Sequence, residues 1–148
     1  MQAAVTQARR ERKTMTNAAP PISSLVALTL PSTPDSVQKA RFHTRAALDG
    51  HELGNYADDA ETITSELVTN AITYACAATF GLDVMHLERA VVAVIVSDSS
   101  PRPPIKRRHC HGAEHGHGLR IVDALSAAWG WQLQTPGKVV YAILTRGV

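Results

Sequence analysis

The spacing of apolar residues predicts three helices along the chain. The clearest one starts at Asp58, where apolar residues recur every three or four positions over about five turns, the period of an amphipathic helix. A second helix begins at Pro34-Asp35, and Gly50 can end it. A third is predicted over residues 119–128, where the same period returns. The apolar positions of the first and third helices are Ala60, Ile63, Leu67, Val68, Ala71, Ile72, Ala75, Leu119, Ile121, Val122, Leu125 and Ala128.

Short apolar runs predict four strands. Residues 25–30 (LVALTL) form the first run. Residues 89–97 (RAVVAVIVS) are apolar at almost every position and rich in valine, which is typical of a strand that is central in a sheet or covered on both faces. Residues 129–134 and 138–145 predict two strands joined by a turn at 135–137.

The order of these elements predicts one α+β domain. Strand, helix, helix, strand, long loop, helix, strand and strand suit a two-layer α/β sandwich, with the helices on one face of a mostly antiparallel mixed sheet. The 148 residues fit one domain, which we assign to residues 25–148. Residues 1–24, with a basic cluster at 9–13, are predicted to be a disordered tail. A nucleic-acid-binding arm and a natural start at Met15 are the alternatives for this tail.

Composition and charge exclude several classes of protein. The formal net charge of +2 is too small to indicate a polyanionic partner by itself. No apolar run approaches the ~18 residues that a membrane span needs, and no apolar stretch typical of a secretory signal follows the basic cluster. Cys76 and Cys110 form no CxxC motif; one disulfide between them remains an alternative, but a reduced protein is favoured. The sequence therefore predicts a cytoplasmic protein that binds neither membranes nor nucleic acid directly.

Polar residues beside these elements outline a candidate site. On the longest predicted helix, Glu66 and Asn70 are one turn apart on a face that meets either solvent or a cleft. Asp98 lies where the chain leaves the valine-rich strand. A long loop over residues 102–117 is typical of a lid or a binding loop. It leads into the glycine-rich stretch 116–119 at a helix N-terminus, where free N–H groups and the helix dipole favour an anion.

Two features of the sequence allow alternative interpretations. Imidazole and thiol groups gather near the end of the long loop and offer a zinc site, although no second group with metal-ligand spacing occurs elsewhere. The other interpretation is a lid that carries histidines, one of them near the bound anion. Lys138 is expected to be an exposed residue at a strand end, with a contact to the anion as the alternative. The loop residues concerned are His109, Cys110, His111, His115 and His117.

Four stretches, in this order, resemble the motifs of the histidine-kinase-like ATPases, and in particular of their small anti-sigma-factor serine kinase branch. The resemblance covers about residues 25–146. It implies a Bergerat-type ATP-binding fold, a two-layer sandwich that clamps ATP and magnesium beneath a mobile lid. The four stretches are ELVTNA (66–71), VSDSSPRPP (96–104), GHGLRIVDALSAAWGW (116–131) and GKVVYAIL (137–144).

The resemblance also implies roles for individual residues. Glu66 would act as the general base toward the attacking hydroxyl, and Asn70 would hold the magnesium ion that bridges the phosphates. Asp98 would accept a hydrogen bond from the adenine amino group. The other residues expected to bind the nucleotide are Pro101, Gly116, His117, Gly118 and Leu119.

The first glycine box departs from the common Asp-x-Gly-x-Gly pattern, because Ser99, Ser100 and Pro101 follow Asp98. Some members of the branch resemble the Asp-x-Ser-x-x-Pro form present here. The resemblance implies a bacterial kinase that phosphorylates an antagonist protein, sequesters a sigma factor and forms a homodimer. Glu66 favours this function, whereas the altered box favours an ATP-binding partner switch without kinase activity. A zinc-dependent interaction module is a third hypothesis.

Overall fold

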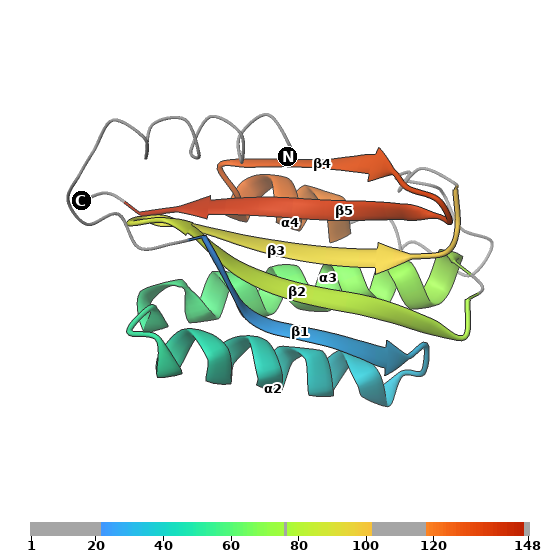
Figure 1. The fold of residues 1–148 in the computed structure, drawn as a ribbon, viewed down its shortest axis with the longest axis horizontal. Helices are drawn as coiled ribbons and strands as arrows, with labels where there is room; N and C mark the ends of the chain where they lie inside the picture. Colours follow the sequence, from blue (N-terminus) through green and yellow to red (C-terminus); the bar gives the residue numbers. More distant parts are fainter. Residues whose placement is uncertain (1–21, 76, 102–117, 147–148) are drawn as a thin grey trace.

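The computed structural model describes residues 22–75, 77–101 and 118–146. Within these ranges, no helix combines the length and the apolar character of a membrane span. Figure 1 shows the elements, which in chain order are β1 (Ser23–Pro31), α2 (Asp35–Gly50), the 3-10 helix η1 (Gly54–Tyr56), α3 (Ala57–Tyr74), β2 (Thr79–Glu88), β3 (Val91–Asp98), α4 (Gly118–Leu125), β4 (Ala128–Leu133) and β5 (Lys138–Thr145).

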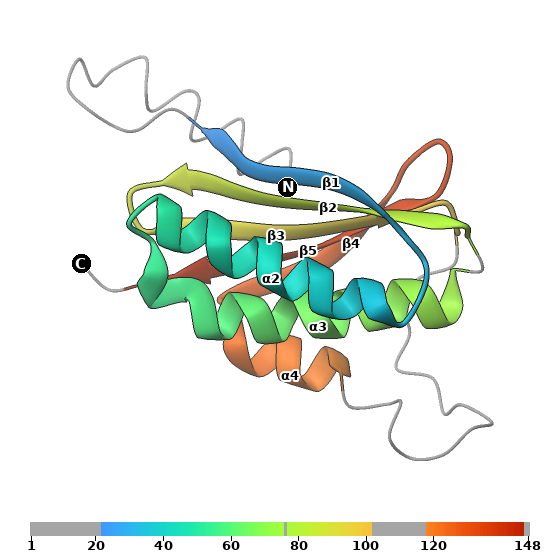
Figure 2. The same cartoon turned by 90° about the horizontal axis from the view of Figure 1, so that it is seen from below.

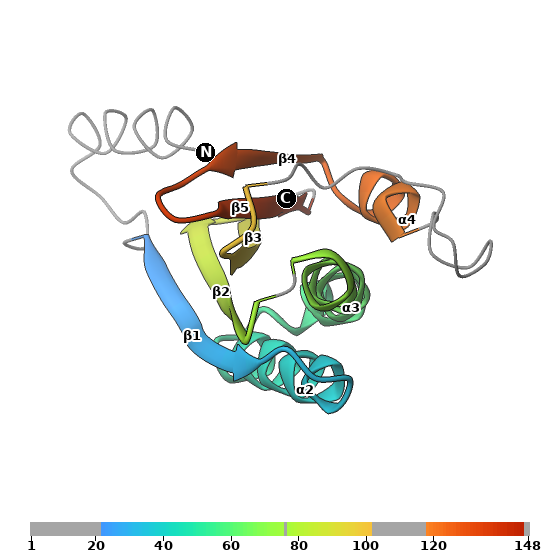
Figure 3. The ribbon, with the colours of Figure 1, turned by 90° about the vertical axis from the view of Figure 1, so that its right-hand side faces the viewer.

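The α-helices of the described residues pack on one face of a single sheet. The five strands have the order β1-β2-β3-β5-β4, and each neighbouring pair is antiparallel. Figures 2 and 3 show α2, α3 and α4 together on the same side of this sheet. The fold is therefore the predicted two-layer α/β sandwich. The sheet, expected to be mostly antiparallel, is antiparallel throughout the described residues.

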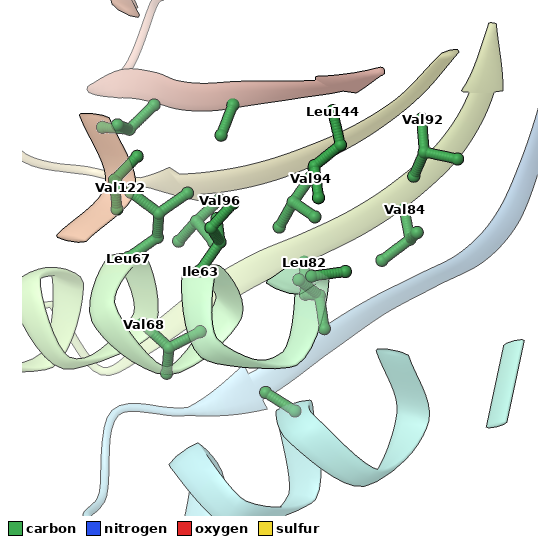
Figure 4. Close-up of a cluster of buried hydrophobic side chains, with 14 of the residues drawn as sticks. Ile63, Leu67, Val68, Leu82, Val84, Val92, Val94, Val96, Val122 and Leu144 are labelled. Carbon is green, nitrogen blue, oxygen red and sulfur yellow. The ribbon is translucent and has the colours of Figure 1, made fainter. Parts of the chain in front are cut away.

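The main hydrophobic core fills the space between the sheet and the helices (Figure 4). Ile63 and Leu67 on α3 are buried against the strands, because the apolar stripe of this helix faces the sheet. This packing holds α3 in place and fixes the direction of the polar residues on its flank. The other labelled core residues are Val68, Leu82, Val84, Val92, Val94, Val96, Val122 and Leu144.

Strand β3 is buried on both faces, as its valine-rich sequence predicts. It is the third of the five strands and therefore central. Because side chains alternate along a strand, Ala93 and Ile95 face away from the helices. There they form a second buried cluster with Leu87 and Val139.

Strand β2 is absent from the sequence prediction. Its side chains do alternate: Phe80, Leu82 and Val84 are buried in the main core, and the residues between them are half-buried. Gly81 and Asp83, two residue types that are depleted in strands, interrupt the apolar run and weaken the local signal. The strand forms because its neighbours β1 and β3 supply hydrogen-bonding partners on both sides.

Two predicted boundaries also differ from the structure. β1 begins at Ser23, inside the stretch predicted to be a disordered tail. α4 ends at Leu125, so Ala128, predicted to belong to this helix, is the first residue of β4. The N–H of Ala127 donates to the carbonyl oxygen of Ile143, which directs the chain into the sheet.

Leu144→Ala is expected to lower the free energy of unfolding by about 2–5 kcal/mol, because the truncation leaves a cavity in the core. Leu144 is fully buried, whereas Leu133 on β4 is 60% exposed and serves as the matched control. Leu133→Ala should change the free energy by about 0.5 kcal/mol or less. Urea unfolding followed by circular dichroism measures both. Similar losses in the two variants would contradict this description of the core.

Candidate functional site

Two polar residues lie on the flank of α3, beside its buried stripe. Glu66 and Asn70 are one helical turn apart, and both are half-buried. Leu67 and Ala71 follow them directly in the sequence and anchor the helix in the core. Because α4 packs against α3, this flank adjoins the start of a second helix.

The carboxylate of Glu66 meets the first residue of α4. A Cβ atom at Gly118 would lie 2.6 Å from Oε2 of Glu66, closer than real Cβ contacts. A side chain at this position would therefore displace the carboxylate or the helix. The structure thus brings together two residues that the sequence analysis assigns to one site from separate motifs.

Glu66 is half-buried and has no compensating partner among the described residues. Burial raises the pKa of its carboxyl group above the ordinary value, and no other group shifts it. Among the described residues, none forms a hydrogen bond or an ion pair with this carboxylate. Because the raised pKa favours the protonated form in the folded state, the ionised form weakens the fold. A group that opposes stability in its charged form is typical of a functional position.

The start of α4 offers hydrogen-bond donors. The first N–H groups of a helix have no partner within it, and the helix dipole is positive at this end. The side chain of Leu119 is 3% exposed and lies in the main core, so only the backbone of this predicted binding residue can face a ligand. Gly116 and His117 lie outside the described residues.

The zinc hypothesis falls outside the described residues as well. His109, Cys110, His111 and His115 all belong to the stretch that the structure does not describe. Within residues 22–75, 77–101 and 118–146, no group of three or more His, Cys, Asp or Glu side chains is placed to hold a metal ion.

Asp98 is buried at the end of β3 and has a charged partner. Its Oδ1 accepts hydrogen bonds from Nζ of Lys138 at 2.9 Å and from the backbone N–H of Ser100 at 2.8 Å. The side chains of Asp98 and Lys138 are 2% and 6% exposed. Pro101, the last described residue before the long loop, is exposed.

The expectation that Lys138 is an exposed residue at a strand end is therefore wrong. Lys138 is the first residue of β5 and lies directly opposite Asp98 in the antiparallel pair with β3. This register places the ammonium group against the carboxylate. The local sequence around Lys138 does not indicate this contact, because Asp98 lies on a strand that is distant in the chain.

Gly137 supports the same pair, and the sequence analysis identifies it only as part of a turn. Its φ is +92°, a conformation that side chains disfavour. A Cβ atom here would overlap the carbonyl oxygen of Asp98 and the backbone of Ser99. The turn before β5 therefore packs backbone against backbone on the end of β3. The Pro136-Gly137 pair is the signal in the sequence that points to such a tight turn.

These parts gather at one end of the molecule. Figures 1 and 2 show the C-terminal end of α3, the end of β3 and the start of α4 on the same side. A hollow of about 320 Å³ opens beside Asp98 and Ser99. Its other walls come from the last part of β1, from the start of β2 with the residues before it, and from the turn before β5. The described residues thus join Glu66 to Gly118 and Asp98 to Lys138 at this end of the molecule.

The donor and acceptor groups suit a ligand that carries phosphate groups with a metal ion at one end and an amino group at the other. The amide oxygen of Asn70 is a hard ligand of the kind that magnesium accepts alongside water. The start of α4 suits a phosphate group. A carboxylate such as Asp98, with one oxygen already bonded, suits an amine donor.

The comparison with protein families matches residues 30–144 to the histidine kinase-like ATPase domain. The matched span runs from the end of β1 to the end of β5 and contains Glu66, Asn70, Asp98 and Lys138. No curated protein matches the chain.

Proposed function

We propose, from the premise that the chain belongs to the histidine kinase-like ATPase domain family, that it is an ATP-dependent protein serine/threonine kinase. It phosphorylates an antagonist protein and sequesters a sigma factor. In this proposal the protein acts in the cytoplasm as a homodimer and contacts neither nucleic acid nor membrane directly. The family is one of ATP-binding domains, so ATP is the nucleotide for which its site is built.

The described residues fit ATP with magnesium. Asn70 offers an amide oxygen for the metal ion. Gly118 is the first residue of α4 and has no side chain, and the first N–H groups of a helix suit phosphate oxygens. The Oδ2 atom of Asp98 accepts no hydrogen bond from the described residues and is available to an amino group. ATP supplies the phosphoryl group to be transferred, and magnesium neutralises its charge.

The single observation that carries the kinase proposal is the environment of Glu66. Its carboxyl group is half-buried, has a pKa that burial raises, and lies at the start of the helix that suits the phosphates. A carboxylate with a raised pKa is a stronger base and is suited to accept the proton of a serine or threonine hydroxyl. A module that only binds ATP has no need of an unpaired carboxylate at this point.

An ATP-binding partner switch without kinase activity is the second candidate. Two observations favour it: no glycine follows Asp98 in the first box, and Oδ1 of Asp98 already accepts hydrogen bonds from Lys138 and Ser100. Such a switch would bind ATP and its protein partners but transfer no phosphoryl group.

Incubation of the purified protein with radiolabelled ATP and magnesium, with and without candidate antagonist proteins, separates the two functions. Label on a serine or threonine of the antagonist supports the kinase. ATP binding without transfer to any antagonist that the protein binds would replace it by the partner switch. Absence of ATP binding at millimolar concentrations would overturn both.

Asp98 is expected to select adenine over guanine by about 1–3 kcal/mol. The carboxylate accepts a hydrogen bond from the amino group of adenine, whereas guanine has a carbonyl oxygen at that position, which gives Oδ2 no donor and repels it. Calorimetric titration with ATP and GTP measures the difference. Asp98→Asn should reduce it, and Asp35→Asn, at an exposed position on α2, is the control. Equal affinity of the natural protein for ATP and GTP would contradict the assignment.

A further inference from the structure

We propose that Gly137 and Lys138 form a clamp that fixes the carboxylate of Asp98 for reading the nucleotide base. Lys138 is then a positioning residue for nucleotide selectivity. This role rests on the proposed binding of ATP and adds to it a residue that acts through Asp98.

The two oxygens of Asp98 have different surroundings. Oδ1 accepts hydrogen bonds from Lys138 and from the N–H of Ser100, whereas Oδ2 accepts none from the described residues. Asp98 also lines the hollow of about 320 Å³ at this end of the sheet. The carboxylate therefore has one oxygen held by the protein and the other open to a donor from a ligand.

Lys138 balances the charge of this carboxylate. Its Nζ donates to Oδ1 of Asp98 at 2.9 Å and to the carbonyl oxygen of Ser100 at 3.2 Å. An ammonium group has three N–H donors, and these two contacts use two of them, so one is left for a further acceptor. The pair thus presents an acceptor and a donor next to each other. The edge of adenine presents the complementary amino group and ring nitrogen.

Gly137 sets the position of this lysine. Because its missing side chain allows the turn to lie directly on Asp98 and Ser99, β5 begins immediately beside the end of β3. The ammonium group of the next residue then reaches the carboxylate across the ladder. Gly137 therefore supports the contact with Asp98 through its backbone, and Lys138 makes that contact through its side chain.

Stability alone does not account for such a pair. Removing two charges from water costs roughly as much as their attraction returns, and apolar residues of similar size are often at least as stable. The pair is also far less exposed than the surface ion pair between Lys39 and Asp35. A buried pair with one open acceptor is instead suited to recognition.

The test compares ATP with purine riboside triphosphate, which lacks the amino group that Asp98 would bind. The natural protein should bind ATP about 10- to 100-fold more tightly, as expected for one hydrogen bond to a charged group. In Lys138→Met this ratio should fall to about threefold or less, because the carboxylate loses its fixed orientation. Lys39→Met removes an exposed lysine and should leave the ratio unchanged.

Circular dichroism and thermal melting establish that each variant is folded. If Lys138→Met does not fold, Lys138→Gln replaces it, because glutamine keeps a hydrogen-bond donor of similar length without the charge. Its preference for ATP over purine riboside triphosphate should be weaker than that of the natural protein but still present. An unchanged ratio in a folded variant would overturn the positioning role, even if both affinities fall together. Equal binding of the two nucleotides by the natural protein would overturn this role and the contact of Asp98 with the adenine amino group, and would leave the binding of ATP itself standing. Binding of neither would overturn the proposed function.

Discussion

Glu66→Gln should lower the rate of phosphoryl transfer to the antagonist by about 10²- to 10⁴-fold while ATP affinity hardly changes. Glutamine keeps the size and the hydrogen-bonding groups of the side chain but cannot accept the proton of the hydroxyl. Transfer of radiolabelled phosphate and calorimetric ATP affinity are measured side by side for both proteins. Unchanged turnover in the variant would leave the proposed kinase activity without its base.

Glu61→Gln is the matched control for this experiment. Glu61 lies on the same helix but forms ion pairs with Arg41 and Arg45 of α2, at 3.2 and 2.6 Å. These arginines lower the pKa of its carboxyl group despite its partial burial. The control should therefore lose stability and keep its rate, whereas Glu66→Gln should lose its rate without losing stability.

The raised pKa of Glu66 gives rate and stability opposite dependences on pH. The base must be ionised, so the rate should fall as the pH is lowered through this pKa, at a higher pH than for an ordinary glutamate. The folded state favours the protonated form of Glu66. As the pH is lowered through the same interval, the contribution of Glu66 to the free energy of unfolding should therefore rise. Glu66→Gln should remove both dependences. A rate profile identical in the variant would contradict the assignment.

Asn70→Ala should abolish magnesium-dependent ATP binding and leave the fold intact. Asn70 is half-buried on the flank of α3, outside the core, so its truncation removes a metal ligand without opening a cavity in the core. Calorimetric titration with ATP in magnesium and in EDTA, together with thermal melting, measures both effects.

Thr73→Ala is the control for this variant, because Thr73 is an exposed residue one turn further along the same helix. It should bind ATP like the natural protein. Retained magnesium-dependent affinity in Asn70→Ala would remove this residue from the site.

The elements predicted best from the sequence are those whose signal is local. The apolar residues of α3 recur every three or four positions, which indicates a helix buried on one face. The nearly continuous apolar run of β3 indicates a strand buried on both faces. β2 lacks such a clear signal, since Gly81 and Asp83 interrupt it. Its existence depends on the two strands beside it, which no local window contains.

The candidate site divides in the same way. Glu66 and Asn70 are recognisable because one helix places them a turn apart. The pairing of Asp98 with Lys138 depends on the register of two strands, and the contact of Glu66 with Gly118 depends on the packing of two helices. Interpretation by residue type alone assigns Lys138 to the surface, as is usual for lysine.

The pairing of Asp98 with Lys138 also imposes an order of assembly. The two residues are 40 positions apart, so their contact requires closure of a long loop, and such nonlocal strand pairing is slow to form. A nascent chain that has been synthesised only as far as Gly137 contains α3 and β3 but leaves β3 as an open edge, which is prone to pair with other chains. Docking of β5 closes that edge and supplies the partner of Asp98 in a single event.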